Sequence, residues 1–426
     1  MKFVLASYGG RGDVEPAVVV GRELLQRGHE VCMAVPPNLV GFTEAAGLAA
    51  VPYGLDSQAI LDAQRKYWTC YFRTPWRLKE LNRLGRETQE FALRCWGEMT
   101  TTLATLADGV DLLMTGLIFE QPAVNVAEYH GIPLSTLHFF PVRPHGQLLR
   151  FLPSPLTRTV MTVNDWLVWR GTRKGEDAQR RELGLPKAKG PAPRRIAERG
   201  SLEIQAYDEV YFPGLPSEWA KRAGRQALNR PFVGALAMEL PTNADEEVVS
   251  WIAGGTPPIC FGFGSIPAES PADTVAMIGA ACAQLGERAL VCSGGTDFSN
   301  VPHFDHVKVV GVVNYATIFP ACRAVVHHGG AGTLAAGLRA GVPQLILWTL
   351  PDQPFFAAQL KRLKVGRGRR FSTTSQKSLV ADLRRILTPQ YFASAREIAT
   401  RITEPAKSAA AAADRVEDFA RRKRVG

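Results

Sequence analysis

Two short apolar runs, each ending in closely spaced glycines, constrain the fold of this chain more than any other feature. The first, Phe3 to Ala6 ahead of Gly9-Gly10, fits a buried parallel strand that stops at a turn. Apolar residues then recur at helical spacing from Val14 to Leu25, and Glu30 to Val35 predicts the next strand. A strand, a helix and a second strand within about 35 residues imply a parallel sheet with right-handed crossovers.

The same pattern begins again at residues 258–265, so we predict two α/β domains. A length of 426 residues exceeds the size at which one hydrophobic core usually stops growing. The predicted divisions are a first domain over 1–230, a linker over 231–245, a second domain over 246–405 and a final helix over 406–426. We expect two Rossmann-like domains facing across a cleft, because ligands of open parallel sheets bind outside the carboxyl ends of the strands.

Composition and charge narrow the classes of partner. Hydrophobic residues make up 46% of the chain and charged residues 21%, which argues against disorder and against membrane integration. A net charge of +10 favours an anionic partner, which is a nucleic acid, an acidic lipid surface or a phosphorylated small molecule. The basic runs 367–370 and 421–424 lack interleaved aromatic residues, so we interpret them as solvated faces rather than nucleic-acid sites.

The cysteines and the N-terminal residues indicate the compartment. Seven cysteines without a CxxC spacing predict neither a disulfide framework nor a zinc site. The apolar stretch at the N-terminus is too short for a secretory signal, and no run reaches the roughly 18–20 apolar residues of a spanning helix. We expect a cytoplasmic protein, with peripheral contact at the inner face of an anionic membrane left open.

The strongest functional motif is HHGGAGT, residues 327–333, which lies between an apolar run and a helical stretch. Its glycines let the backbone approach an anion, and the N–H groups and macrodipole of a helix start favour negative charge by about 0.3–1 kcal/mol. Thr333 adds a hydroxyl donor and His328 a ring donor. The motif therefore fits a diphosphate, whereas a merely tight turn would need neither two histidines nor a threonine.

A carboxylate follows the first predicted strand in the sequence GGRGD, residues 9–13. An aspartate is ionised at neutral pH and can accept the proton of an attacking hydroxyl group. We therefore predict Asp13 as the catalytic base. Its alternative role, which is compatible with the first, is to cap the helix that is expected to begin near Val14.

The third motif is Pro351-Asp352-Gln353, after the predicted strand that ends at Trp348. A carboxylate beside an amide can hold adjacent hydroxyl groups of a sugar through several hydrogen bonds. A loop turn explains the motif equally well. Its place about 20 residues after the phosphate motif is what favours sugar binding.

Residues 56–108 interrupt the alternation of strands and helices with a helical segment rich in tyrosine, tryptophan and phenylalanine. Aromatic residues at helical spacing are more often plain core than a binding surface. This segment and Phe139-Phe140 are nevertheless our candidate wall for a bulky apolar acceptor.

Four motifs, in this order along nearly the whole chain, resemble the bacterial family 1 glycosyltransferases of the GT-B fold. They are SYGGRGDVEP at 7–16, FGFGS at 261–265, HHGGAGT and PDQ. The similar branch modifies glycopeptide antibiotics and mycobacterial glycopeptidolipids and includes sterol glucosyltransferases. The resemblance implies that a hexose or deoxyhexose moves from a UDP- or dTDP-sugar to a hydroxyl group of an apolar acceptor, without a cofactor. It also implies that the first domain binds the acceptor, that the second binds the nucleotide sugar, and that the final helix crosses back to the first.

The resemblance also assigns residues, with Asp13 as the base. The expected donor contacts are Gly10, Arg11, Gly12, Ser265, Val312, Val313, His328, Gly330, Ala331, Gly332, Thr333, Asp352 and Gln353. Among these, Ser265 would reach a phosphate from the opposite side, and the two valines would hold the nucleobase. Other members place a histidine at position 13 and pair it with a separate aspartate. A carboxylate base needs no such helper, so Glu120, His138 and Phe139 are candidates only for the acceptor side.

We expect a single displacement with inversion and without a metal ion. No D-x-D triplet occurs in the sequence to hold magnesium or manganese, so the phosphate motif must stabilise the leaving diphosphate. A nicotinamide oxidoreductase would need G-x-G-x-x-G, but Pro267 replaces the third glycine after Gly262 and Gly264. A nucleotide-sugar epimerase of the same fold and a non-catalytic nucleotide-sugar-binding protein are the remaining alternatives. No known nucleic-acid-binding motif is present.

Overall fold

The computed structural model describes residues 1–148, 152–223, 229–262, 270–294 and 300–424. Ser265, a predicted donor contact, lies outside the described residues, as do the last three residues of the FGFGS motif. The chain divides into two compact units. Unit 1 combines Met1–Met238 with Thr403–Gly426, and unit 2 spans Glu239–Ile402.

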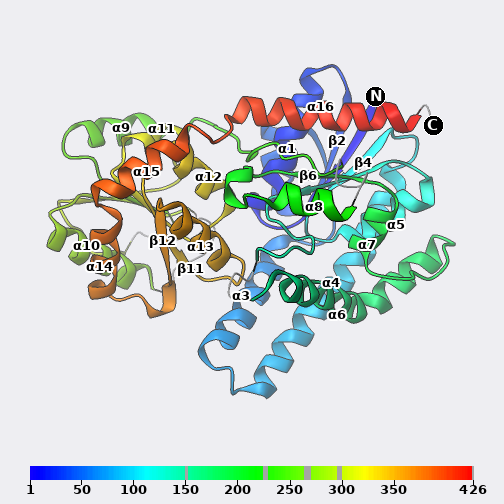
Figure 1. The fold of residues 1–426 in the computed structure, drawn as a ribbon, viewed down its shortest axis with the longest axis horizontal. Helices are drawn as coiled ribbons and strands as arrows, with labels where there is room; N and C mark the ends of the chain where they lie inside the picture. Colours follow the sequence, from blue (N-terminus) through cyan, green and yellow to red (C-terminus); the bar gives the residue numbers. More distant parts are fainter. Residues whose placement is uncertain (149–151, 224–228, 263–269, 295–299, 425–426) are drawn as a thin grey trace. The chain divides into compact units, whose positions relative to one another are not determined.

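Unit 1 is built on six parallel strands in the order β3-β2-β1-β4-β5-β6 (Figure 1). The strands are β1 (Lys2–Ala6), β2 (Glu30–Val35), β3 (Ala49–Pro52), β4 (Leu112–Thr115), β5 (Leu134–His138) and β6 (Leu202–Gln205). The order reverses between β1 and β4. The carboxyl ends of these two strands therefore form a switch point, where open parallel sheets bind their ligands.

Helices cover both faces of this sheet because its strands are apolar on both sides. Phe3 and Leu5 of β1 enter one core and Val4 and Ala6 the other, as the alternation of a strand requires. The helices are α1 (Arg11–Gln26), α2 (Val40–Ala45), α3 (Ser57–Arg73), α4 (Leu78–Leu106), α5 (Glu120–His130), α6 (Ser154–Glu182), α7 (Ala192–Glu198), α8 (Leu215–Ala223) and α16 (Pro405–Arg424), with short 3-10 turns at Pro37–Leu39 and Glu209–Tyr211. The predicted helical segment 56–108 corresponds to α3 and α4.

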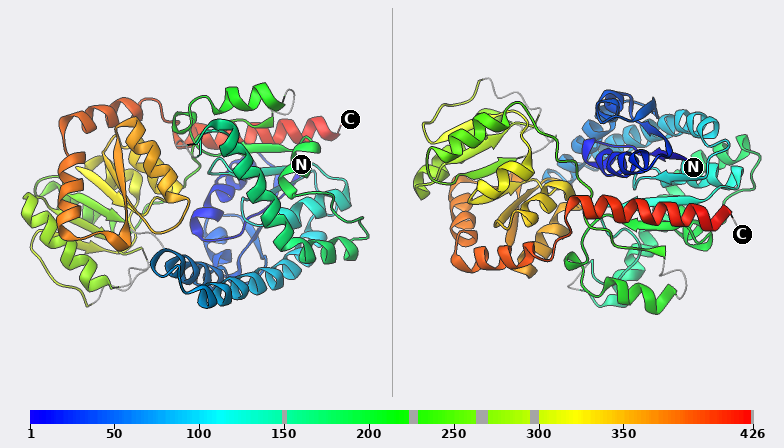
Figure 2. Two further views of the ribbon diagram at one scale, coloured as in Figure 1. Left: turned by 60° about the horizontal axis from the view of Figure 1, so that its bottom comes forward. Right: turned by 90° about the horizontal axis from the view of Figure 1, so that it is seen from above.

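The last helix of the chain packs beside the first, as Figures 1 and 2 show in red and blue. Val416 and Phe419 of α16 are buried in the same core as α1. Arg27 donates to Asp414 (2.7 Å), and His29 Nε2 lies 3.0 Å from Glu417 Oε1. The alanine run of α16 allows this close approach between the two helices.

Unit 2 repeats the architecture with six parallel strands in the order β12-β11-β10-β7-β8-β9. The strands are β7 (Ile259–Gly262), β8 (Ala289–Cys292), β9 (Val307–Val310), β10 (Ala324–His327), β11 (Gln344–Trp348) and β12 (Gly366–Arg370). The helices are α9 (Asp245–Ala253), α10 (Pro271–Leu285), α11 (Tyr315–Ile318), α12 (Ala331–Arg339), α13 (Gln353–Leu363), α14 (Gln376–Ile386) and α15 (Pro389–Ala399), with 3-10 turns at Phe319–Ala321 and Phe371–Thr373. Its switch point lies between β7 and β10.

One strand of unit 2 coincides with a basic run that was not predicted to be a strand. Residues 367–370, interpreted as a solvated face, form most of the edge strand β12. Arg369 Nε donates to Asp382 Oδ2 at 2.5 Å. Charged side chains on an edge strand discourage pairing with other chains, so the run has a structural role. Separately, none of the helices in the described ranges has both the length and the apolar composition needed to cross a membrane.

Candidate active site

Asp13 is the third residue of α1, at the carboxyl edge of the unit 1 sheet beside the switch point. Its Oδ2 accepts a hydrogen bond from the Gly10 N–H (2.7 Å), and Ser7 Oγ donates to its carbonyl oxygen (2.9 Å). The helix begins three residues earlier than predicted, with Gly10 at the cap position, so Asp13 is not the cap. Glycine has no side chain to cap the helix, and Asp13 supplies only the bond back to the Gly10 N–H. Gly9 has φ +128°, and a Cβ there would lie 2.3 Å from the Asp13 carboxylate. Only glycine therefore lets the carboxylate fold back over this turn.

Of the other residues of the GGRGD motif, Gly10 precedes α1 at the cap position, and Arg11 and Gly12 begin the helix. The Gly10 N–H is occupied by Asp13. Arg11 is exposed; its Nε lies 3.3 Å from Glu15 Oε2 and its guanidinium 4.8 Å from the centre of the Phe42 ring. Gly12 is also exposed. Their donor contacts stay a prediction.

Glu120 and His138, the predicted acceptor-side residues, lie in a buried ionic network near the same edge of the sheet. Glu120 is 6% exposed and His138 is fully buried. Arg143 donates to both oxygens of Glu120 (2.8 and 3.0 Å) and pairs with Glu203. His138 Nε2 lies 2.7 Å from Glu120 Oε1, and Gln205 donates to His138 Nδ1 (3.3 Å). The third candidate, Phe139, is half-buried, so it is the one of the three with an accessible side chain.

The network fixes the protonation states of its members. Burial acts to raise the pKa of Glu120, but Arg143 and His138 outweigh burial and lower that pKa to about 2. Burial and the charge of Arg143 lower the pKa of His138. The pair therefore consists of an ionised carboxylate and a neutral imidazole whose Nε2–H donates to the carboxylate.

Asp165 on α6 provides a test of this charge arrangement. Burial raises its pKa to about 6, Glu120 adds to the rise, and Arg143 opposes it. A carboxylate whose pKa is raised in the folded state lowers stability progressively as pH rises from its unfolded value, about 3.9, to its folded value, and the full loss is present above that. Asp165→Asn should therefore stabilise the protein by roughly 1–2 kcal/mol at about pH 8 and by much less at about pH 4. Urea unfolding at both pH values checks this, and a gain of equal size at both would contradict it.

In unit 2, the HHGGAGT motif forms the turn from β10 into α12. Gly329 has φ +100°, and Gly330 is the cap residue, with no side chain capping the helix. The first backbone bond into the helix runs from the Leu334 N–H to the Gly330 carbonyl (2.9 Å). The N–H groups of residues 331–333 thus precede the first intrahelical donor and point out of the helix end. Such an end is suited to a phosphate group.

The two histidines of the motif have different environments. His327 is fully buried; its Nδ1 accepts from the Gly329 N–H (3.2 Å), so its Nε2–H donates to Gln344 Oε1 (2.9 Å). Burial lowers the pKa of His327 to about 3. This residue holds the turn rather than a ligand.

His328 is half-buried, and its Nδ1 is a buried polar atom with no partner among the described residues. Burial lowers its pKa to about 4, although a hydrogen bond with the Gly262 backbone acts in the opposite direction. The imidazole is neutral without a ligand, and the negative charge of a diphosphate beside Nδ1 would raise its pKa, so that both ring nitrogens could then donate. A buried ring nitrogen without a partner is the kind of atom that a bound ligand satisfies.

The remaining predicted donor contacts lie on neighbouring loops of the same sheet edge. Val312 is 51% exposed, Val313 is buried, and the adjacent Asn314 N–H donates to Asp245 (2.8 Å). Three strand spacings, roughly 14 Å, separate the end of β9 from that of β10. A nucleoside diphosphate can span this distance, whereas a free phosphate cannot.

Asp352 and Gln353 differ in how much of each residue is exposed. Asp352 is exposed. Gln353 is 3% exposed, and its Oε1 accepts from the N–H groups of Thr349 (2.7 Å) and Leu350 (3.0 Å). A Cβ on Gly329 would lie 3.1 Å from Gln353 Cβ. Gln353 therefore joins the loop of residues 349–352 to the turn at Gly329, and its oxygen already accepts two backbone hydrogen bonds.

Comparison with known sequences shows the family to which the chain belongs. The chain is 60% identical over 427 residues to uncharacterized glycosyltransferases of Mycobacterium bovis and Mycobacterium tuberculosis, and the match covers 100% of both sequences. The chain belongs to the family 1 glycosyltransferases. This membership confirms the resemblance found in the sequence motifs.

More distant relatives of this glycosyltransferase agree with the assignment. Residues 287–418 match the model of the erythromycin biosynthesis protein CIII-like C-terminal domain. Glycosyltransferase GtfE of Amycolatopsis orientalis is 28% identical, with 96% of each chain covered. Among solved structures, the calicheamicin glycosyltransferase CalG4 has a TM-score of 0.69 at 16% identity, with 98% of each chain covered. VinC in complex with dTDP has a TM-score of 0.65 at 19% identity, with 100% of each chain covered. The predicted GT-B fold is confirmed.

The predicted contacts to the diphosphate can be tested by measuring the affinity of this glycosyltransferase for a nucleoside diphosphate. Thr333→Val and His328→Phe each remove one donor that we expect to reach the diphosphate. Hydrogen bonds to charged groups are the stronger class, so each change should weaken binding of a nucleoside diphosphate about tenfold and both together about a hundredfold. Calorimetric titration measures the affinity.

Thr388→Val, at the cap position of α15 in the same unit, is the matched control for Thr333→Val and should leave the affinity unchanged. Unaltered affinity in both turn variants would show that the diphosphate binds elsewhere.

Proposed function

We propose that this glycosyltransferase moves a hexose or deoxyhexose from a UDP- or dTDP-sugar to a hydroxyl group of an apolar acceptor, with inversion and without a metal ion. Unit 1 binds the acceptor and unit 2 the nucleotide sugar. The observation that carries the donor assignment is that His328 Nδ1 has no partner among the described residues and lies beside the start of α12, which no side chain of those residues caps.

Asp13 acts as the base in this scheme. It takes the proton of the acceptor hydroxyl as the oxygen forms a bond to the anomeric carbon, and the bond from that carbon to the diphosphate breaks. The departing electron pair stays on the diphosphate, which the N–H groups of 331–333, the Thr333 hydroxyl and the His328 ring stabilise. The bond from Gly10 supports this role, because its N–H holds one carboxylate oxygen at a fixed position.

The donor and acceptor classes draw support from relatives. VinC and SsfS6 were solved with dTDP, and a sterol 3-beta-glucosyltransferase of Arabidopsis thaliana is 27% identical to this chain over 86% of its length. We propose a glycopeptidolipid, a glycopeptide or a sterol-like molecule as acceptor, and a cytoplasmic location with contact at the inner face of an anionic membrane.

Mass spectrometry of the purified protein with a panel of nucleotide sugars and a cell lipid extract tests the proposal. We expect a product heavier than one lipid by a single sugar residue, formed equally well with EDTA, and an anomeric configuration opposite to that of the donor by NMR. Loss of product with EDTA would contradict metal independence. An isomerised nucleotide sugar without a glycosylated lipid would instead favour an epimerase.

A further inference from the structure

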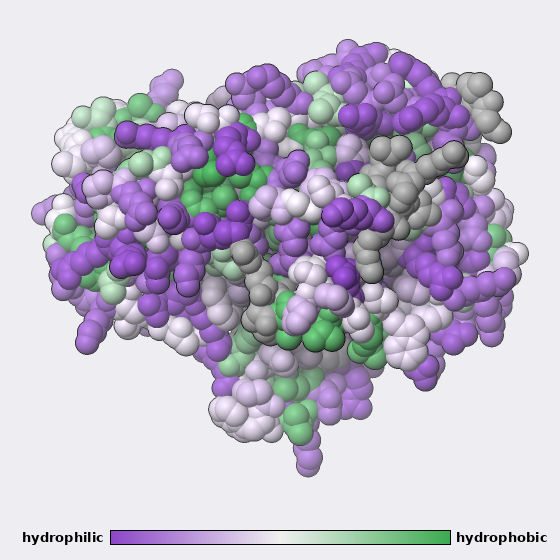
Figure 3. All heavy atoms as spheres, in the orientation of Figure 1, coloured by the Kyte–Doolittle hydropathy of each residue, from purple (hydrophilic) through white to green (hydrophobic). Residues whose placement is uncertain are grey.

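The first half of α6 presents an unusual surface, with large apolar side chains directed outward. Four of them lie one helical turn apart, and each has about half of its surface exposed. They are Leu156 (53%), Val160 (48%), Val163 (49%) and Leu167 (56%). We call these four residues the α6 stripe. Their spacing places them on one narrow face of the helix, and Figure 3 shows green apolar side chains gathered where α6 lies in Figure 1.

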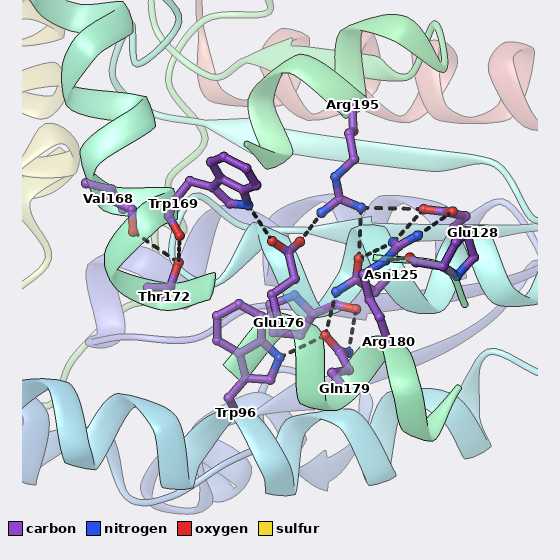
Figure 4. Close-up of polar contacts among 12 residues, drawn as sticks. Trp96, Asn125, Glu128, Val168, Trp169, Thr172, Glu176, Gln179, Arg180 and Arg195 are labelled. Carbon is purple, nitrogen blue, oxygen red and sulfur yellow. Dashed lines mark hydrogen bonds and ion pairs between the residues drawn. The ribbon is translucent and has the colours of Figure 1, made fainter. Parts of the chain in front are cut away.

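The second half of the same helix is firmly held in unit 1. Gln179 accepts from Trp96 Nε1 (2.8 Å) and from Asn125 Nδ2 (2.7 Å), and Arg180 makes two bonds of 2.8 Å to Glu128. Figure 4 shows this buried network, which links α6 to α4, α5 and α7. Because the helix is anchored by its C-terminal half, the α6 stripe is presented on a rigid element.

The charges near the α6 stripe indicate whether a second copy of the chain or an anionic surface is the better partner. Residues 154–174 contain four basic side chains and a single acid, Asp165. Continuing the same helical spacing beyond Leu167 places Arg170 and Lys174 on the same face, and both are exposed. Asp165 is half-buried on the opposite face. A second copy of the chain would offer no acid from this segment to match those cations, whereas an anionic surface matches them.

A tryptophan borders the stripe in the arrangement suited to a lipid–water boundary. Trp166 is 44% exposed, and the Arg170 guanidinium lies 5.2 Å from the centre of its ring. Tryptophan and arginine side chains with an apolar body and a polar end are typical of that boundary. A helix with an apolar face and basic residues next to it is also typical of interfacial binding.

We infer that the first half of α6 is the surface through which this enzyme docks on an anionic membrane, with the α6 stripe in the lipid and Arg170 and Lys174 on the headgroups. The inference deepens the proposed function, because a lipid-like acceptor would be met at that membrane. It does not require the transfer reaction, so binding is measured without donor or acceptor.

The experiment is co-sedimentation with vesicles of phosphatidylcholine, with and without phosphatidylglycerol. We expect the wild type to pellet with the anionic vesicles and less with the neutral ones. Val163→Gln/Leu167→Gln should bind the anionic vesicles about tenfold more weakly. Arg170→Gln/Lys174→Gln should bind them about 25-fold more weakly, and its binding should depend less on salt.

A double variant elsewhere controls for exposed apolar area. Leu25 and Val249 are 41% and 40% exposed, and Leu25→Gln/Val249→Gln should pellet as the wild type does. Equal pelleting of the wild type and the stripe variant would overturn the inference, as would a wild type that binds neither vesicle. A wild-type dimer that the stripe variant dissociates, without vesicle binding, would assign the surface to a second copy. If the wild type binds vesicles and forms no glycosylated product, the proposed function fails and the docking surface stands.

Discussion

Asp13→Asn should lower the rate of glycosyl transfer by about 10² to 10⁴ while leaving the affinity for the nucleotide sugar unchanged. The amide oxygen can still accept the Gly10 N–H bond that Asp13 Oδ2 accepts at 2.7 Å, so the start of α1 is kept and the negative charge alone is lost. Steady-state kinetics should therefore show a loss in kcat, and calorimetry an unchanged Kd for the donor.

Asp56→Asn is the matched control for this change. Asp56 caps α3 of the same unit and accepts the Gln58 N–H at 2.7 Å. Each of the two substitutions therefore replaces a carboxylate that accepts a backbone N–H at the start of a helix. The control should retain wild-type kcat. A full rate in Asp13→Asn would remove Asp13 from the mechanism, and a weakened donor Kd would indicate a role in donor binding instead.

Arg143→Met should destabilise unit 1 by about 3–5 kcal/mol, because it leaves the buried carboxylates of Glu120 and Glu203 without their shared cation. Arg143 is 3% exposed and bonds both residues. For a unit of this size the loss corresponds to a fall in Tm of about 10 °C. Calorimetric or circular-dichroism melting measures it.

The cause of that loss can be separated from lost packing. Adding Glu120→Gln to Arg143→Met removes the charge that Arg143 neutralised at Glu120, whereas Glu203 keeps Arg230 as a partner at 2.8 Å; this change should restore most of the Tm. A double variant as unstable as the single one would show that packing dominates. A single variant with the Tm of the wild type would contradict the charge account altogether.

The fold could be predicted largely from the sequence because its strands are buried on both faces. Continuous apolar runs, such as those of β1, β2 and β10, identify such strands directly. β3 and β6 were not predicted, because Ala49–Pro52 ends in a proline and Leu202–Gln205 contains two polar residues, so neither is a continuous apolar run. β12 was not predicted either, because the alternating glycines and arginines of Gly366–Arg370 do not form an apolar run.

The candidate site was only partly predictable. The position of Asp13 at a strand end follows from its motif, but its place inside the helix depends on where the helix starts, and Gly10 carries no side-chain signal. The separation of His327 from His328 could have been anticipated, because successive residues at a strand end point to opposite sides. The partners of Glu120 could not, since spatial proximity alone selects Arg143 from 50 lysines and arginines.

The most direct measurement of the role of Asp13 is chemical rescue of Asp13→Ala by formate, a small carboxylate that can occupy the vacated space. If Asp13 is the base, formate should raise the transfer rate of this variant about tenfold or more and leave the wild-type rate unchanged. A variant that binds the donor normally and gains nothing from formate, or that transfers sugar at the wild-type rate without it, would contradict the assignment.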